Sequence, residues 1–239
     1  MKRFFTKSWS AIIRPFTGYF SQLLTSLILL FIFRPYGRGA LYMAIWEVFL
    51  VVLFLTAMLN CHHSKKIKIF AACFGIPALL LEWIHLIYPH THIALAFVLC
   101  TIIFIFITTS SIIKQVVINA RVRMETLRGV VCAYFMVAFG FAFFYYLVGL
   151  IDINSFSFSN FDPLHSTHSH LLSELMYFSF VTLLCIGYGD VIAVHDVAQT
   201  LAILEGVVGQ FYIAILVSRL VAVYSFFEHK LHLVSKDKS

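Results

Sequence analysis

Six long apolar stretches dominate this 239-residue chain. They approach or exceed the roughly 20 residues that a helix needs to cross a bilayer. They cover residues 18–33, 40–59, 69–88, 92–113, 129–151 and 198–227. With 61% hydrophobic and 12% charged residues, a soluble fold could not cover 26 Phe and 11 Tyr with polar surface. We therefore expect an all-α integral membrane protein with six transmembrane helices, which excludes soluble enzymes and free nucleic-acid binders.

The positively charged residues predict the orientation of these helices. If the N-terminus is cytoplasmic, 14 Lys and Arg residues fall in inner segments, and only Arg34 and Arg38 fall in outer ones. The positive-inside rule then places both the N- and C-termini in the cytoplasm. We expect the first apolar stretch to be retained as a helix, because no small-residue cleavage site follows it.

The segment between the last two apolar stretches breaks the regular pattern. It begins with a polar stretch, residues 152–170, that is typical of an extracellular loop. Residues 171–184 are apolar but too few to cross the membrane, so they predict a half-helix that enters and returns. Glu174 lies near the start of this half-helix, where a negative charge interacts favourably with the helix dipole, but the effect is weak.

The string TLLCIGYGD, residues 182–190, follows this half-helix and indicates a cation pathway. Gly187 and Gly189 lack a Cβ, so the backbone there can take an unusual conformation with successive carbonyls on one side. Irregular backbone at membrane depth is tolerated where it lines a wet path. Four copies around an axis would present rings of carbonyl oxygens in place of an ion's hydration shell, with Tyr188 wedged outward against aromatic neighbours.

This string resembles the TxGYG selectivity signature of potassium channels, the standard case of carbonyl-based ion selection. The resemblance covers residues 129–227, and the four helices ahead of them are similar in layout to bacterial six-transmembrane potassium channels. It implies a homotetramer in lipid, in a bacterial inner membrane, with K⁺ as the transported ion and without a cofactor, a nucleic-acid partner or a soluble partner. The filter residues that it implies are Cys185, Ile186, Gly187, Tyr188 and Gly189, with K⁺ at the first four and with Thr182 and Asp190 in support.

Five segments follow from the apolar pattern and the resemblance together. Residues 1–17 form an N-terminal segment that lies on the membrane or is a disordered basic tail, and residues 18–113 form a four-helix domain like a voltage sensor. Residues 114–128 are predicted to form a basic amphipathic linker helix at the inner interface. Residues 129–227 form the pore domain, and residues 228–239 form a short cytoplasmic tail.

Four positions depart from the family pattern or leave a choice open. Potassium channels usually have Thr where this chain has Cys185, and a thiol is a poor oxygen substitute for a hard cation. Position 181 is Val and not a carboxylate, so Asp190 is expected to rest on Tyr177 or on water. Gly206 and Gly209 in the last helix either form a hinge or permit close packing.

The ionisable residues within the first four helices predict weak voltage dependence. The fourth stretch, residues 92–113, has no Lys or Arg to move through the membrane field. Glu47 and Glu82 remain, and His85 lies one turn from Glu82, as a proton-sensing pair or as a buried hydrogen bond. Glu205 in the last helix either faces the cavity or packs behind the half-helix.

The outer loop carries a histidine cluster, HxxHxH, formed by His165, His168 and His170. Such a cluster binds a metal, senses external pH or is simply solvated. Five Cys residues without CxxC spacing predict neither a disulfide framework nor a zinc site.

The leading functional hypothesis is a passive potassium-selective channel. An intramembrane enzyme is disfavoured, because no GxSG or HExxH motif is present. The alternative that stays open is a non-conducting or weakly selective regulatory or structural subunit that retains the channel architecture.

Overall fold

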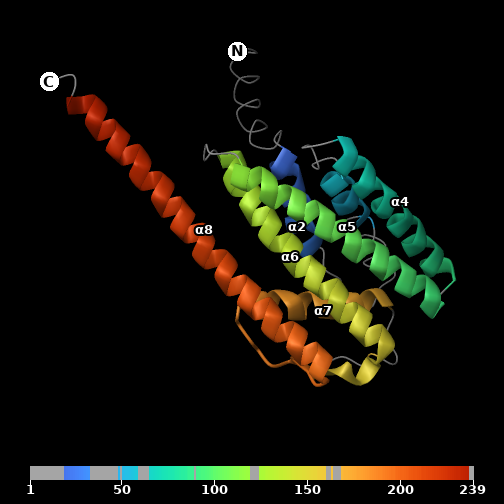
Figure 1. The fold of residues 1–239 in the computed structure, drawn as a ribbon. Helices are drawn as coiled ribbons and strands as arrows, with labels where there is room; N and C mark the ends of the chain where they lie inside the picture. The colour runs from blue at the N-terminus through green and yellow to red at the C-terminus, as the bar shows by residue number, and fades with distance from the viewer. Residues whose placement is uncertain are drawn as a thin grey trace, which may run out of the picture.

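The computed structural model describes residues 19–32, 48, 50–58, 65–88, 90–118, 124–159, 163 and 168–236. The protein is mainly helical, with long helices packed side by side and one short helix, α7, lying across their end (Figure 1). Residues 50–58 are also helical. The named helices are α2 (Tyr19–Ile32), α4 (Lys65–Ile87), α5 (Thr91–Ile118), α6 (Met124–Ile151), α7 (His168–Leu183) and α8 (Asp196–Lys236).

Four of these helices are long and apolar enough to cross a membrane, which makes the chain a multi-pass membrane protein by length and composition. The candidate spans are Lys65–His85, Thr91–Val116, Thr126–Ile151 and Asp196–Ser218. They match the last four apolar stretches of the sequence. The apolar part of α2, Phe20–Leu30, is shorter than a span. Half of the expected second helix, including Glu47, lies outside the described residues.

The helices pack mainly against their neighbours in the chain. Helix α5 packs against α4 and α6, and α2 packs against α6. Aromatic side chains form several of these contacts: Phe54 stacks on Phe104 with ring centroids 4.8 Å apart, and Phe97 meets Phe143 at 5.9 Å. Short connections bring consecutive helices together with little loop-closure cost, which explains the contacts of α5 with α4 and α6, whereas α2 and α6 meet although they are far apart in the chain.

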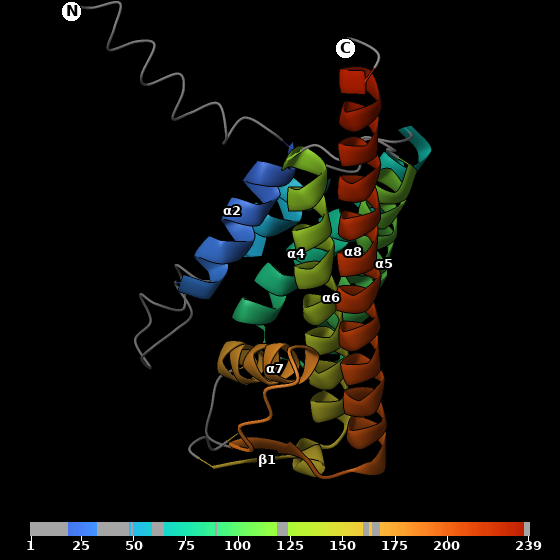
Figure 2. The ribbon, with the colours of Figure 1, turned by 90° about the vertical axis from the view of Figure 1, so that its left-hand side faces the viewer.

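Helix α7 is the expected short half-helix, and it lies crosswise to α6 and α8 (Figure 2). It packs on both of them and buries ten residues. It begins at His168 and ends at Leu183, against an expected range of 171–184. With 16 residues, it is too short to cross the membrane, as its length in the sequence predicted.

A small sheet that the sequence analysis did not predict brackets this region. Strand β1 (Phe156–Phe158) pairs antiparallel with β2 (Val191–Ala193), with Phe156 opposite Ala193. A 3-10 helix, η2 (Ile153–Ser155), joins α6 to β1. The sheet therefore ties the segment before α7 to the segment after residues 184–190.

The linker and the tail differ in part from the predicted segments. Helix α5 continues through Ile118 and α6 begins at Met124, so both ends of the predicted linker 114–128 belong to long helices. Residues 119–123 lie outside the described residues, as do residues 1–17. Helix α8 continues through most of the predicted tail 228–239, as far as Lys236.

Candidate functional site at the end of α7

Helix α7 ends in a capped turn that places Cys185 in a left-handed conformation. The N–H of Ile186 donates to the carbonyl of Val181 at 2.9 Å, and the N–H of Cys185 donates to the carbonyl of Thr182 at 2.9 Å. This pair of bonds is the Schellman pattern, and Cys185 has the expected positive φ of 54°. Glycine usually holds this position, because a left-handed conformation costs a residue with a Cβ about 1–2 kcal/mol. The Thr182 carbonyl is thus used in the cap.

The residues after the cap alternate in backbone conformation. Cys185, Gly187 and Gly189 have φ values of 54°, 66° and 79°, whereas Ile186 and Tyr188 between them do not have positive φ. We call residues 184–190 the GYGD segment. Its first six residues are exposed in the single chain. Tyr188 is 69% exposed, so the expected packing of its ring against aromatic neighbours is not made within one chain.

Asp190 closes the GYGD segment with hydrogen bonds on both sides. The hydroxyl of Tyr177 on α7 donates to Asp190 Oδ2 at 2.7 Å, which is the contact expected from the sequence. The N–H of Val191 donates to Asp190 Oδ1 at 3.1 Å, and the N–H of Ser159 donates to the Asp190 carbonyl at 2.9 Å. Asp190 therefore links the segment both to α7 and to the turn after β1.

The two glycines of α8 occupy different environments. A Cβ added at Gly209 would lie 2.3 Å from the Leu183 carbonyl oxygen at the end of α7, whereas one added at Gly206 would meet nothing within 4 Å. The Leu183 carbonyl also accepts a hydrogen bond from the Tyr134 hydroxyl at 3.1 Å. One position after Gly209, the Gln210 side-chain amide donates to Cys185 Sγ at 3.1 Å. This contact geometry favours close packing at Gly209.

Glu205 is fully buried behind α7 and makes polar contacts with two other helices. Its Oε2 accepts a hydrogen bond from the Tyr145 hydroxyl of α6 at 2.6 Å, and its Oε1 lies 2.5 Å from Ser179 Oγ of α7. Ser179 Oγ is also 2.6 Å from the Ala138 carbonyl oxygen. Of the two positions that the sequence left open, the structure supports packing behind the half-helix.

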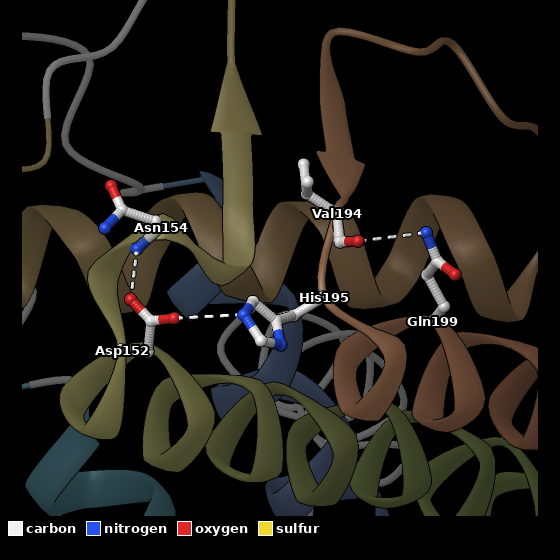
Figure 3. A network of polar contacts seen from close by, with 5 residues as sticks. All are labelled: Asp152, Asn154, Val194, His195 and Gln199. Atoms are coloured by element: carbon white, nitrogen blue, oxygen red, sulfur yellow. Dashed lines mark hydrogen bonds and ion pairs between the residues drawn. The ribbon is translucent and has the colours of Figure 1, made fainter.

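A polar network joins the C-terminal end of α6 to the N-terminal end of α8 (Figure 3). Asp152 Oδ2 lies 3.3 Å from His195 Nε2, and Asp152 Oδ1 accepts from the N–H of Asn154 at 3.0 Å. The Gln199 amide donates to the Val194 carbonyl at 3.1 Å. Asp152 directly follows α6, and His195 directly precedes α8. This network and the β1–β2 pair therefore connect the chain before α7 with the chain after the GYGD segment.

The remaining ionisable candidates are arranged differently from the sequence interpretation. The His85 ring contacts His168 of α7, with centroids 4.6 Å apart, and neither of its ring nitrogens has a hydrogen-bond partner among the described residues. The expected hydrogen bond between Glu82 and His85 is therefore not made, although Glu82 is buried in α4 as expected. His165 lies outside the described residues, and the described ones contain no cluster of three or more metal-ligating side chains.

The sequence analysis missed the hydroxyl groups that support this region. Tyr134, Tyr145 and Ser179 all donate to or contact oxygens at the end of α7 or on Glu205. The available signal was that each is a polar group within an apolar helix, and such groups are hydrogen-bonded when buried. Their partners, however, lie 26 to 60 positions away in the chain.

Comparison with known proteins agrees with this geometry. A search of curated proteins finds no match to the chain. A family model described as "Ion channel" matches residues 133–225, which is less than half of the chain but includes α7, the GYGD segment and most of α6. The match points to a non-enzymatic transport protein and supports an ion channel domain at residues 133–225.

Proposed function

We propose that four copies of this chain form a potassium-selective channel that conducts K⁺ passively across the membrane. The observation that carries the proposal is the left-handed conformation at every second residue, Cys185, Gly187 and Gly189, directly after the crosswise helix α7. In an ordinary strand, successive carbonyls point to opposite sides. Changing the sign of φ at alternate residues turns every second peptide plane over and brings successive carbonyls to one side. Such a ladder of oxygens replaces the hydration shell of a potassium ion.

The exposure of the GYGD segment supports assembly around it. Exposed irregular backbone cannot face lipid, because its polar groups would lose their hydrogen bonds, so it must face protein or water. Helix α8 also exposes a stripe of apolar side chains at four-residue spacing, which includes Ile203, Phe211 and Ile215 at 68%, 64% and 64% exposure. A ring of four copies would line an ion path with the GYGD segments and cover part of this stripe.

The fourth apolar stretch supplies no positive charges for strong voltage sensing. Helix α5 contains no Lys or Arg over residues 91–113. A steep sensor needs several charges per subunit, each contributing about 2.3 kcal/mol per 100 mV. The channel is therefore expected to open almost independently of voltage.

A second candidate function rests on Cys185. A thiol in place of a hydroxyl gives the innermost site a soft ligand, which a potassium ion binds poorly. A non-conducting or weakly selective subunit with the same architecture is the alternative function.

Reconstitution separates these functions. The purified protein in liposomes with a potassium gradient is expected to give a flux that barium blocks and that sodium cannot replace. The Gly187→Ala variant tests the carrying observation, because a Cβ there meets nothing within 4 Å but forces an L residue to φ 66°. We expect it to lose selective flux, whereas Gly206→Ala, also in open space, keeps it. Flux without selectivity would refute potassium selection, and a tetramer without flux would establish the non-conducting alternative.

A further inference from the structure

The short contacts around Glu205 need three protons, and an ionised carboxylate would leave only two. Three short oxygen–oxygen contacts meet at this site: Tyr145 to Oε2 at 2.6 Å, Ser179 to Oε1 at 2.5 Å, and Ser179 to the Ala138 carbonyl at 2.6 Å. Each is a hydrogen bond only if one proton lies between its two oxygens. The Tyr145 and Ser179 hydroxyls supply two protons, and a carbonyl oxygen supplies none. The Glu205 carboxyl is the remaining group in these contacts that can carry the third proton.

A protonated carboxyl satisfies every group in this arrangement. Tyr145 donates a hydrogen bond to Oε2, the acid donates one from Oε1 to Ser179 Oγ, and the Ser179 hydroxyl donates one to the Ala138 carbonyl. An ionised Glu205 would leave two hydroxyl protons for three contacts, so two facing oxygens would repel each other. Within the described part of the chain, no Lys, Arg or His forms an ion pair with Glu205. A fully buried carboxylate without a cationic partner is strongly disfavoured.

The same contact sets the register of three helices behind the GYGD segment. On α7 and α8, Ser179 meets Glu205, and one turn further along both helices Leu183 meets Gly209. On α6, Ala138 contacts Ser179, and Tyr134 one turn away donates to the Leu183 carbonyl. Residues four apart share a helix face, so the three helices meet at two levels that are one helical turn apart. Leu183 directly precedes the GYGD segment.

We propose that Glu205 is a neutral carboxylic acid, and that its proton joins α6, α7 and α8 and so positions the GYGD segment. Glu205 is a positioning residue in this proposal, because it touches α7 and not the ion path. The protonation itself does not depend on the proposed function, whereas the effect on selective flux rests on it.

Infrared difference spectroscopy on the purified full-length protein tests the protonation directly. The spectrum of wild type minus Glu205→Gln at neutral pH is expected to contain the carbonyl band of a protonated carboxylic acid. In wild type minus Ser179→Ala, the same band is expected to shift, because Ser179 accepts the proton of the acid. Glu174→Gln, which removes a partly buried carboxyl of α7, is the matched control, and the spectrum of wild type minus Glu174→Gln should lack this band. Absence of the band from the Glu205→Gln difference spectrum overturns the proposal, whether or not the protein conducts.

Potassium flux in liposomes tests the positioning role. The Gln amide presents an NH2 donor group and a carbonyl acceptor in place of the O–H and C=O of the acid. Glu205→Gln is therefore expected to fold and to keep its flux and potassium selectivity within about twofold. Glu205→Ala removes the acceptor of the buried Tyr145 hydroxyl and the contact between α8 and Ser179, and we expect selective flux to fall about tenfold or more. Failure of Glu205→Gln to fold, or a loss as large as that of Glu205→Ala, would contradict a neutral acid. Equal selective flux in all three proteins would refute the positioning role while leaving the infrared result to stand alone.

Discussion

The two glycines of α8 offer a matched test of how this helix packs. They lie three residues apart in one helix, and only Gly209 faces the end of α7. A methyl group at Gly209 would lie 2.3 Å from the Leu183 carbonyl oxygen, whereas ordinary contacts begin near 3.4 Å. The opposing atom belongs to the backbone and cannot rotate away. Gly209→Ala must therefore push α7 and α8 apart by about 1 Å.

The two substitutions are expected to change the free energy of unfolding in opposite directions. Overpacking of this kind costs about 1–3 kcal/mol, and the better helix propensity of Ala offsets about 0.5–1 kcal/mol of it. Gly206→Ala has no steric cost within the chain and gains the propensity term alone. For a chain of this size, 1 kcal/mol corresponds to about 2–4 °C in the unfolding midpoint. We expect the midpoint to fall by about 3–8 °C for Gly209→Ala and to rise by about 2 °C for Gly206→Ala.

Thermal unfolding of both proteins in the same detergent measures these shifts, and potassium flux in liposomes reports their effect on the GYGD segment. Gly209→Ala moves the carbonyl that Tyr134 holds, one residue before this segment, so selective flux should fall together with stability. Gly206→Ala should conduct normally. If Gly206→Ala were the more damaging change, or if both variants kept stability and lost flux, the glycines would act as a hinge and the packing argument would be wrong.

Three further predictions concern the GYGD segment and the response to voltage. Tyr177→Phe removes the hydroxyl that donates to Asp190 at 2.7 Å, which costs about 1–2 kcal/mol of hydrogen-bond energy. The selectivity for potassium over sodium should then fall in bi-ionic recordings, and unchanged selectivity would show that this bond is dispensable. Cys185→Thr places a β-branched side chain at φ 54° and should lower the unfolding midpoint. Cys185→Gly should keep the midpoint near that of the wild type, and a lower midpoint for the Gly variant than for the Thr variant would contradict the left-handed cap. Open probability between about −120 and +120 mV should change as if about one elementary charge or less moved, and a steep curve worth several charges would show that the first four helices sense voltage.

The membrane helices and the half-helix could be predicted from the sequence because their signals are local. The last four apolar stretches correspond to the four candidate spans, since length and hydropathy alone decide whether a helix suits a bilayer. Residues 171–184 were too few to cross, and α7 has the corresponding short length. The two glycines of GYG predicted an unusual backbone conformation, and both take positive φ, because glycine has no Cβ to oppose it.

The contacts that support the GYGD segment were decided only by tertiary structure. Glycine marks a left-handed cap in a sequence, but here Cys185 holds that position, because the bonds to Val181 and Thr182 and the packing around α7 outweigh its strain. Helical spacing suggested that His85 would meet Glu82, yet its ring contacts His168 on a distant segment. Glu205 likewise finds its hydroxyl partners 26 and 60 residues away. Local periodicity determines which face a side chain is on, but only the packing of the helices determines what that face meets.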